Sequence, residues 1–294
     1  MLNAEQIARF RTDGFLVVED VFSPAEVAAY RAAAESGRIR EINANRKHTE
    51  VHVHQLEVTC KDPLFRDLAA DARLTDKLAP LIGEDLQVQH SKLATQPLKK
   101  DVGGFGWHQD FAFFPHTNTD LAAIFVYLDD TDTENGCMSM VRGSHKLGLL
   151  EHRVDGYFSG KCQEEQAWSD ASKVVPVRVR AGGISIHHCL TLHGSGPNKS
   201  GLPRRGVVYQ YRNADAYQLA DHIWQDTGFQ VRGRFSETVR CEAGRIYIAK
   251  RKAWDPPFGN LYLQIGEQAQ RWNAERQGAG CRTPASEQVA AVTG

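Results

Sequence analysis

Short apolar segments separated by turn residues fill the middle of the sequence, between about residues 85 and 212. Six of them have the length of strands, at 86–93, 122–128, 137–141, 174–179, 184–188 and 207–212. In one of them Val175, Val177 and Val179 alternate with polar residues such as Arg178, which is the period of a half-buried strand. Strands spaced in this way predict an antiparallel sandwich or barrel.

Helical patterns precede these strands. Asn3 with Gln6, and Ser23-Pro24 with Glu26, form capping signatures that predict two helices on either side of a short strand at 14–18. A third helical pattern covers 63–81. The polar, histidine-containing segment 38–59 has no clear period, so we expect a loop that folds over a site.

The length favours a single domain that covers residues 1–294. We expect a helical N-terminal part (1–82), a β core (83–212), a C-terminal extension (213–277) and a flexible tail (278–294). Two stretches without a strong period, 143–173 and 213–243, are expected to form rim or lid insertions.

Composition excludes several partners. The chain is 41% hydrophobic and 24% charged, as in ordinary globular proteins, and its net charge of -1 gives no bulk attraction to nucleic acid or an anionic membrane. It lacks a signal-peptide pattern and any apolar run of membrane-spanning length. Six scattered cysteines without a C-x-x-C pair predict a reducing, cytoplasmic setting. The oligomeric state stays open.

One short motif points to chemistry. In Trp107-His108-Gln109-Asp110, side chains two apart on a strand would project from the same face, so His108 and Asp110 would face one ion together. The best third ligand is His193. Two histidines and one carboxylate form the facial triad of non-haem iron(II) oxygenases. Arg204 follows eleven residues later, and its guanidinium suits the distal carboxylate of a keto-acid cosubstrate.

The order of these motifs resembles the phytanoyl-CoA dioxygenase family of iron(II)/2-oxoglutarate oxygenases. Similar family segments include AEQIARFRTDGFLVVEDVFSPAEVAAYR, ENGCMSMVRGSHK and HHCLTLHGSGPN, so the resemblance covers about residues 4–212. It implies a mainly β fold with flanking helices, the double-stranded β-helix (jelly roll, cupin-like). It also implies a dioxygenase that uses Fe(II), 2-oxoglutarate and O2 to hydroxylate or otherwise oxidise a C–H bond of a small molecule, releasing succinate and CO2.

The resemblance also implies roles for particular residues. His108, Asp110 and His193 would be the catalytic metal ligands, and Arg204 and Ser195 would bind the distal carboxylate of 2-oxoglutarate. Gln96, followed by Pro97, stands where many relatives have lysine. It is expected to offer the cosubstrate a hydrogen bond but no charge.

Two other functions fit part of the pattern: a catalytically idle jelly-roll protein that binds metal or senses a ligand, and a zinc hydrolase. The presence of all three ligands together with Arg204 favours the dioxygenase, because a zinc hydrolase would not need that arginine. Asp110 argues against halogenation, since related halogenases have a small residue at this position.

Several neighbouring residues allow a structural interpretation. Of His187 and His188, one is expected to pack in the core and the other to line the barrel without a role. His145 is expected at the rim. Arg205 should point away from the cavity if Arg204 faces it, because adjacent strand residues point oppositely. The dipeptide Asn135-Gly136 predicts a type I′ turn with no chemistry.

Aromatic and basic residues near the motifs leave the substrate open. An aromatic group could form an apolar wall beside the iron or fill the core; its members are Trp107, Phe111, Phe113 and Phe114. Arg142, Gln210 and Arg212 indicate an anionic or polar group on the substrate.

Overall fold

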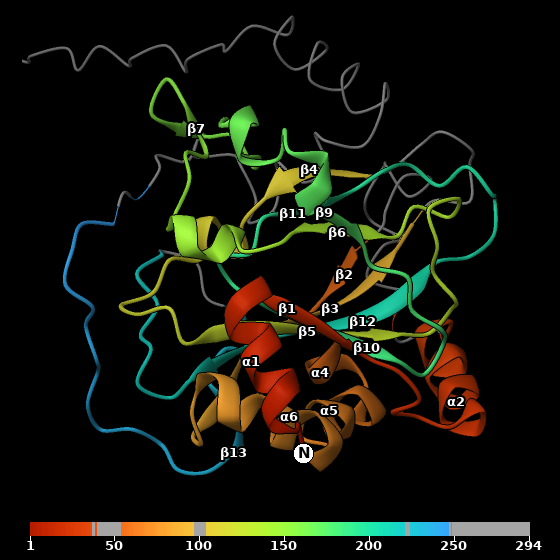
Figure 1. Ribbon diagram of the computed structural model, residues 1–294. Coiled ribbons are helices and arrows are strands. Elements are labelled where there is room, and N and C mark those ends of the chain that lie inside the picture. The colour runs from red at the N-terminus through yellow and green to blue at the C-terminus, as the bar shows by residue number, and fades with distance from the viewer. Residues whose placement is uncertain (37–38, 40–53, 97–103, 221–223, 247, 249–294) are drawn as a thin grey trace, which may run out of the picture.

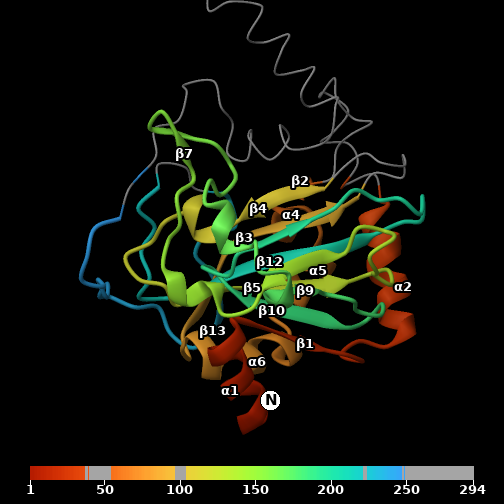
Figure 2. The ribbon, with the colours of Figure 1, turned by 45° about the horizontal axis from the view of Figure 1, so that its top comes forward.

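Two antiparallel β-sheets face each other in the computed structural model of the protein, and helices cover the outer face of the larger sheet (Figures 1 and 2). The structure describes residues 1–36, 39, 54–96, 104–220, 224–246 and 248. The predicted tail, most of the 38–53 segment and Pro97 lie outside these residues.

The larger sheet has seven strands. Its order is β1 (Phe15–Val18), β10 (Ile184–His188), β5 (Leu121–Tyr127), β12 (Arg205–Asn213), β3 (Leu86–Thr95) and β13 (Phe229–Arg232), with β2 (His54–Leu56) also paired to β3. The smaller sheet has the order β4 (Phe105–His108), β11 (His193–Ser195), β6 (Met138–Val141) and β9 (Val174–Pro176). This two-sheet arrangement is the predicted jelly roll.

The interior lies between the sheets, and strand alternation decides which side chains reach it. From the larger sheet come Phe15, Ala94, Phe125, Tyr127 and Val208, which pack against Met138, Met140, Val177 and Val179. Their sequence neighbours point the other way. Leu93, Val126, Val207 and Tyr209 face the helices and pack with Phe65, Leu74 and Leu78.

The helices begin where their capping residues indicate. Helix α1 (Ala4–Asp13) starts at Asn3 and α2 (Pro24–Ala34) at Ser23, each with a reciprocal capping box. The helical pattern predicted over 63–81 is confirmed and consists of two helices, α5 (Pro63–Ala69) and α6 (Ala72–Ile82). They are separate because Asp71 accepts a hydrogen bond from the Arg73 backbone and caps a new helix.

Other predicted segments contain short elements that the pattern did not reveal. The described end of segment 38–59 forms strand β2 and part of helix α4 (Val58–Lys61), and the C-terminal extension contributes β13. The 143–173 insertion holds the hairpin of β7 (Arg153–Val154) and β8 (Tyr157–Phe158), with 3-10 helices η4 (Ser144–Leu147), η5 (Glu165–Ala167) and η6 (Ala171–Lys173).

The predicted type I′ turn at Asn135-Gly136 is wrong. That turn requires positive φ at both residues, yet only Gly136 has it, at φ 77°. Asn135 instead holds the loop through its side chain, which donates to the Asp130 carbonyl and accepts from the Asp132 amide. A Cβ at Gly136 would lie 2.7 Å from the Gly196 carbonyl oxygen, so this turn is packed against the 193–198 segment.

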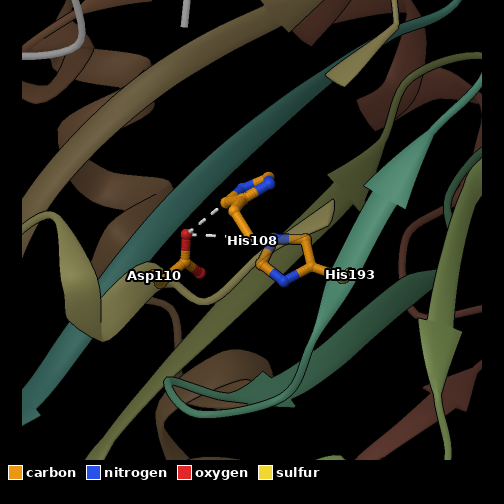
Figure 3. Close-up of side chains that lie close together, drawn as sticks. All are labelled: His108, Asp110 and His193. Carbon is orange, nitrogen blue, oxygen red and sulfur yellow. Dashed lines mark ion pairs between the residues drawn. The ribbon is translucent and has the colours of Figure 1, made fainter. Parts of the chain in front are cut away.

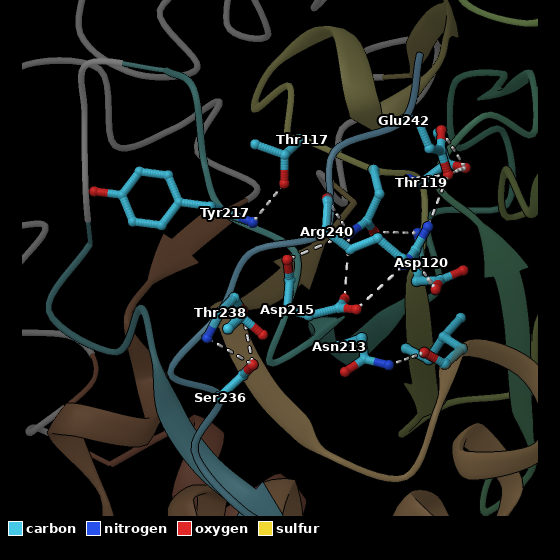
Figure 4. Close-up of polar contacts among 12 residues, drawn as sticks. Thr117, Thr119, Asp120, Asn213, Asp215, Tyr217, Ser236, Thr238, Arg240 and Glu242 are labelled. Carbon is cyan, nitrogen blue, oxygen red and sulfur yellow. Dashed lines mark hydrogen bonds and ion pairs between the residues drawn. The ribbon is translucent and has the colours of Figure 1, made fainter.

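The segment after β13 runs along the end of the larger sheet, where polar contacts fix it (Figure 4). Arg240 forms ion pairs with Asp120, Asp215 and Glu242. The Arg240 carbonyl accepts a hydrogen bond from the side-chain amide of Asn118. None of the described helices is both long and apolar enough to cross a membrane.

Candidate metal centre

Three side chains from two adjacent strands and a turn converge in the interior (Figure 3). His108 ends β4 and His193 begins β11, and the two residues are direct partners in the antiparallel register. Asp110 Oδ1 lies 3.9 Å from His108 Nε2 and 3.8 Å from His193 Nε2. Two ligands bound to one ion at about 2 Å each lie up to about 4 Å apart, so these separations suit a shared ion.

The two histidines present their Nε2 atoms to this centre. His108 Nδ1 lies 2.8 Å from the Gly106 carbonyl oxygen, and His193 Nδ1 lies 2.9 Å from that of Thr191. A carbonyl only accepts, so each Nδ1 carries the proton and each Nε2 keeps its lone pair. Burial lowers the pKa of both imidazoles, which keeps them neutral, as metal ligands must be.

Asp110 presents one oxygen to the centre because the other is occupied. Oδ2 accepts hydrogen bonds from His187 Nε2 at 3.0 Å and from Gln210 Nε2 at 2.7 Å. Burial alone would raise the pKa of Asp110, but the neighbouring histidines, with the hydrogen bond from His187, outweigh it and hold that pKa well below its usual range. The carboxylate is therefore ionised, with Oδ1 available to a metal.

Asp110 departs from the predicted strand geometry. It does not continue the strand: β4 ends at His108, and Asp110 begins the 3-10 helix η3 (Asp110–Ala112), closed by a hydrogen bond from the Phe113 amide to the Asp110 carbonyl. Gln109 does point away, and its side chain binds the backbone of Gly148, Leu150 and Leu190. A turn, rather than strand alternation, brings Asp110 to the two histidines.

A pocket extends from the three residues to Arg204 and Ser195. Gln96 lies beside them: its Nε2 donates to Ser195 Oγ at 3.2 Å, and its backbone amide donates to the Arg204 carbonyl at 2.9 Å. The structure thus brings all six predicted site residues to one region.

Arg204 is 5% exposed, and its Nε has no hydrogen-bond partner. Burial lowers its pKa. Arg204 lines the pocket, and no carboxylate among the described residues pairs with its guanidinium. Arg205 points outward, as predicted, and pairs with Asp129 at 2.8 Å and with Glu35.

The aromatic residues near the motif belong to the core. None of the four that the sequence singled out lines the pocket. Phe113 packs edge-on against His108 and Phe158, and Trp107 stacks on Trp168. The rings that do line the pocket are those of His54, Phe105 and Phe125, together with the histidines of the centre. His54 and Phe105 stack with centroids 4.9 Å apart, a pairing across two sheets that no sequence pattern indicated.

Of the remaining candidate residues, two contact the converging side chains, and both bind Asp110. His187 is not a residue without a role, because it binds Asp110, and Gln210 does so too. Arg142 pairs with Asp13 on the surface, and Arg212 binds the side chain of Gln87.

His188 and His145 also lie off the pocket. Their rings pack together with centroids 5.5 Å apart, and His145 Nε2 donates to the Arg11 carbonyl, as expected of a rim residue. Both were predicted without a catalytic role, and neither contacts the three converging side chains.

The chain is similar to known proteins in both sequence and fold. Residues 10–206 match the profile of the family described as phytanoyl-CoA dioxygenase (PhyH). A probable alpha-ketoglutarate-dependent hypophosphite dioxygenase from Stutzerimonas stutzeri is 30% identical over 236 residues, 74% of this chain and 80% of its own. An ectoine dioxygenase from Sphingopyxis alaskensis is 28% identical over 71% of this chain and 76% of its own. The solved structure of the non-haem alpha-ketoglutarate-dependent carbocyclase SnoK from nogalamycin biosynthesis superposes with a TM-score of 0.63, at 27% identity, over 79% of this chain and 94% of its own.

Proposed function

This chain belongs to the phytanoyl-CoA dioxygenase family of Fe(II)/2-oxoglutarate-dependent oxygenases, and from that premise we propose that His108, Asp110 and His193 hold its iron and that a small molecule is oxidised beside them. The donor set suits the metal: two neutral imidazoles and one carboxylate on one side of an ion leave its other positions open. With iron, 2-oxoglutarate and O2 bound, the centre would oxidise a C–H or comparable bond of the substrate. Succinate and CO2 would be released from the cosubstrate.

The protein's own part is orientation. Backbone carbonyls fix the two imidazole tautomers, and His187 and Gln210 fix the carboxylate. Phe105, Phe125 and His54 line the pocket and give the reacting region aromatic walls.

The proposal that 2-oxoglutarate is the cosubstrate rests on Arg204. Among the residues that the structure describes, the buried guanidinium of Arg204 has no counter-ion, which is unfavourable. The distal carboxylate of 2-oxoglutarate would supply a negative charge and an acceptor for the unpartnered Nε. We propose that Ser195 donates a hydrogen bond to the same carboxylate and that Gln96 orients Ser195.

Replacing Arg204 by methionine tests this proposal against a matched neighbour. Anaerobic titration of the Fe(II)-loaded protein with 2-oxoglutarate should produce a visible charge-transfer band. In Arg204→Met the midpoint should rise at least about 30-fold, because breaking a buried charge pair costs about 2–5 kcal/mol. Arg205→Met removes an arginine one residue away that contacts Asp129 outside the pocket, and its midpoint should stay within about twofold.

The same pair of variants separates the alternatives. A zinc hydrolase would act with zinc and without 2-oxoglutarate, and Arg204→Met would leave its activity intact. An idle binding protein would give the charge-transfer band but no succinate with any substrate. Equal midpoints for Arg204→Met and Arg205→Met would contradict the cosubstrate site.

We also propose a single domain and a reducing, cytoplasmic setting. In support, the five cysteines that the structure describes are all free thiols. The relatives are named for hypophosphite and ectoine, and both are small molecules. A small-molecule substrate is therefore proposed here too.

A further inference from the structure

A glycine of the larger sheet leaves a space that an aromatic ring fills. Gly206 lies on β12 between its register partners, Tyr127 of β5 and Ala94 of β3. Its φ lies outside the left-handed region, so the backbone conformation does not require glycine there. A Cβ at this position would, however, overlap Cε1 of Phe125 and lie 2.5 Å from its Cζ. The Phe125 ring therefore occupies the place that a side chain at 206 would take.

The Phe125 ring leans along the sheet from its own level to that of Gly206. In the register Phe125 is opposite Val208, two residues further along β12. The ring stacks on Tyr127 with centroids 4.4 Å apart, and the guanidinium carbon of Arg204 lies 5.7 Å from the Phe125 centroid. The ring thus covers the strand at Gly206 and lies beside the arginine that we propose for the cosubstrate.

This position lies between the two ends of the proposed cosubstrate subsite. Alternate residues of β12 face the interior, and Gln210 among them binds Asp110 at the metal centre. Arg204, just before the strand, lines the other end of the same pocket. The Phe125 ring covers the interval between these two ends. The carbon chain that joins the keto acid group of 2-oxoglutarate to its distal carboxylate would cross this interval, with the ring as its apolar wall.

We propose that Gly206 and Phe125 are a matched pair that selects the cosubstrate by its length. Glycine lets the ring lie against the sheet, and the ring in this position leaves room for a five-carbon 2-oxo diacid but not for a longer one. Phe125 contacts the carbon chain, and Gly206 is a positioning residue that acts through Phe125. This inference rests on the proposed function and names what selects its cosubstrate.

An added side chain at position 206 would move the ring into the pocket. The backbone of β12 lies behind the ring and Tyr127 is stacked on it, so a methyl group at 206 displaces the ring toward the interior. The displaced ring takes the room of the cosubstrate's carbon chain. The pair therefore predicts that a small substitution outside the charged subsite weakens the binding of 2-oxoglutarate.

The test measures binding rather than turnover. The anaerobic Fe(II)-loaded protein is titrated with 2-oxoglutarate and with 2-oxoadipate, which is one methylene longer, and the midpoint of the charge-transfer band is recorded for each acid. Wild type should bind 2-oxoglutarate at least about tenfold more tightly, the usual effect of one methylene in a close-fitting pocket. In Gly206→Ala the 2-oxoglutarate midpoint should rise at least about tenfold, because the ring is over-packed. In Phe125→Leu the discrimination between the two acids should fall at least about threefold.

A double variant tests whether the two residues share one space. Leucine at 125 lacks Cε1 and Cζ, the two ring atoms nearest to the added Cβ. In the Phe125→Leu background, Gly206→Ala should therefore weaken 2-oxoglutarate binding by no more than about threefold. The same tenfold loss in both backgrounds would mean that the residues act independently, and it would overturn the inference.

A second glycine near the pocket provides the matched control. Gly196 also has a φ outside the left-handed region, and an added Cβ would meet no atom of the described residues within 4 Å. The midpoints of Gly196→Ala should stay within about twofold of wild type. Thermal unfolding shows whether each variant folds. If Gly206→Ala does not fold, the discrimination measured in Phe125→Leu decides the inference.

The outcomes separate the inference from the proposed function. If wild type gives no charge-transfer band, the proposed function fails and the inference fails with it. If the band forms but wild type binds both acids equally, the inference alone is overturned. The same holds if Gly206→Ala binds 2-oxoglutarate like wild type, or if Phe125→Leu keeps the full discrimination.

Discussion

At the scale of single residues, the centre depends on two side chains that never touch the metal position. His187 and Gln210 both donate to the same oxygen of Asp110 and leave the other oxygen as the single ligand atom. Both donors are buried, at 2% and 1% exposed, so water does not compete for the carboxylate. A carboxylate held in this way binds an ion through one oxygen and leaves the open positions to ligands.

Gln210→Leu should therefore weaken metal binding. The expected loss is about 10–100-fold in affinity, the usual effect of removing a partner of a metal ligand. Titration of the apo-protein with Co(II) under visible absorption measures it. Gln87→Leu is the matched control, since Gln87 is also a buried glutamine of the large sheet but binds Arg212 and Gln230. Equal metal affinity in the two variants would assign Gln210 a purely structural role.

The three converging residues could be predicted from sequence, whereas their supporting partners could not. H-x-D and the later HGSGPN segment are local patterns, so the sequence alone predicts His108, Asp110 and His193 as ligands. The contacts of Asp110 to His187 and Gln210 join residues 77 and 100 positions apart, and they depend on how η3 meets two central strands. A sequence pattern does not show which residues of distant segments lie side by side in the fold.

At the scale of elements, the capping residues make the helices predictable from sequence. The edge strands are too short to be recognised in this way. Strand β13 alternates as Phe229, Gln230, Val231 and Arg232, but four residues bounded by Gly228 and Gly233 do not differ from a loop by pattern alone. Only its pairing with β3 shows that it extends the sheet.

The ion pairs of the segment that follows β13 should stabilise that segment and contribute little to the stability of the whole fold. Arg240→Ala removes its ion pairs to Asp120, Asp215 and Glu242. Because these side chains are substantially exposed, the free energy of unfolding should fall by only about 1 kcal/mol or less. Limited proteolysis within 234–246 should nevertheless become several-fold faster. Arg234→Ala, in the same segment, should leave the cleavage rate unchanged, and equal rates in both variants would refute the local role.

At the scale of the whole molecule, buried neutral histidines make the fold sensitive to acid. Burial lowers the pKa of His116 to about 3 and that of His152 to about 4. In the unfolded chain both titrate near about 6.5. The unfolded state therefore binds more protons between these values, so the stability present above about pH 6.5 is lost as the pH falls toward 4.

Each of these histidines should contribute a slope of up to about 1.4 kcal/mol per pH unit in that window. Urea unfolding of the apo-protein at pH 7, 6 and 5 measures it. His152→Gln should be less stable at pH 7, because it loses the bonds to Leu150 and Gln109, but its stability should depend less steeply on pH. A slope identical to that of wild type would show that folding does not lower the pKa of His152.

Both sheets contribute to the metal position. His108 and His193 belong to the smaller sheet, while the residues that grip Asp110 belong to β10 and β12 of the larger one. An ion bound at this point is a cross-link between the two walls of the cavity. Removing the ion would take away the centre that activates O2. It would also remove the constraint on the distance between the two walls, and the substrate must fit between them.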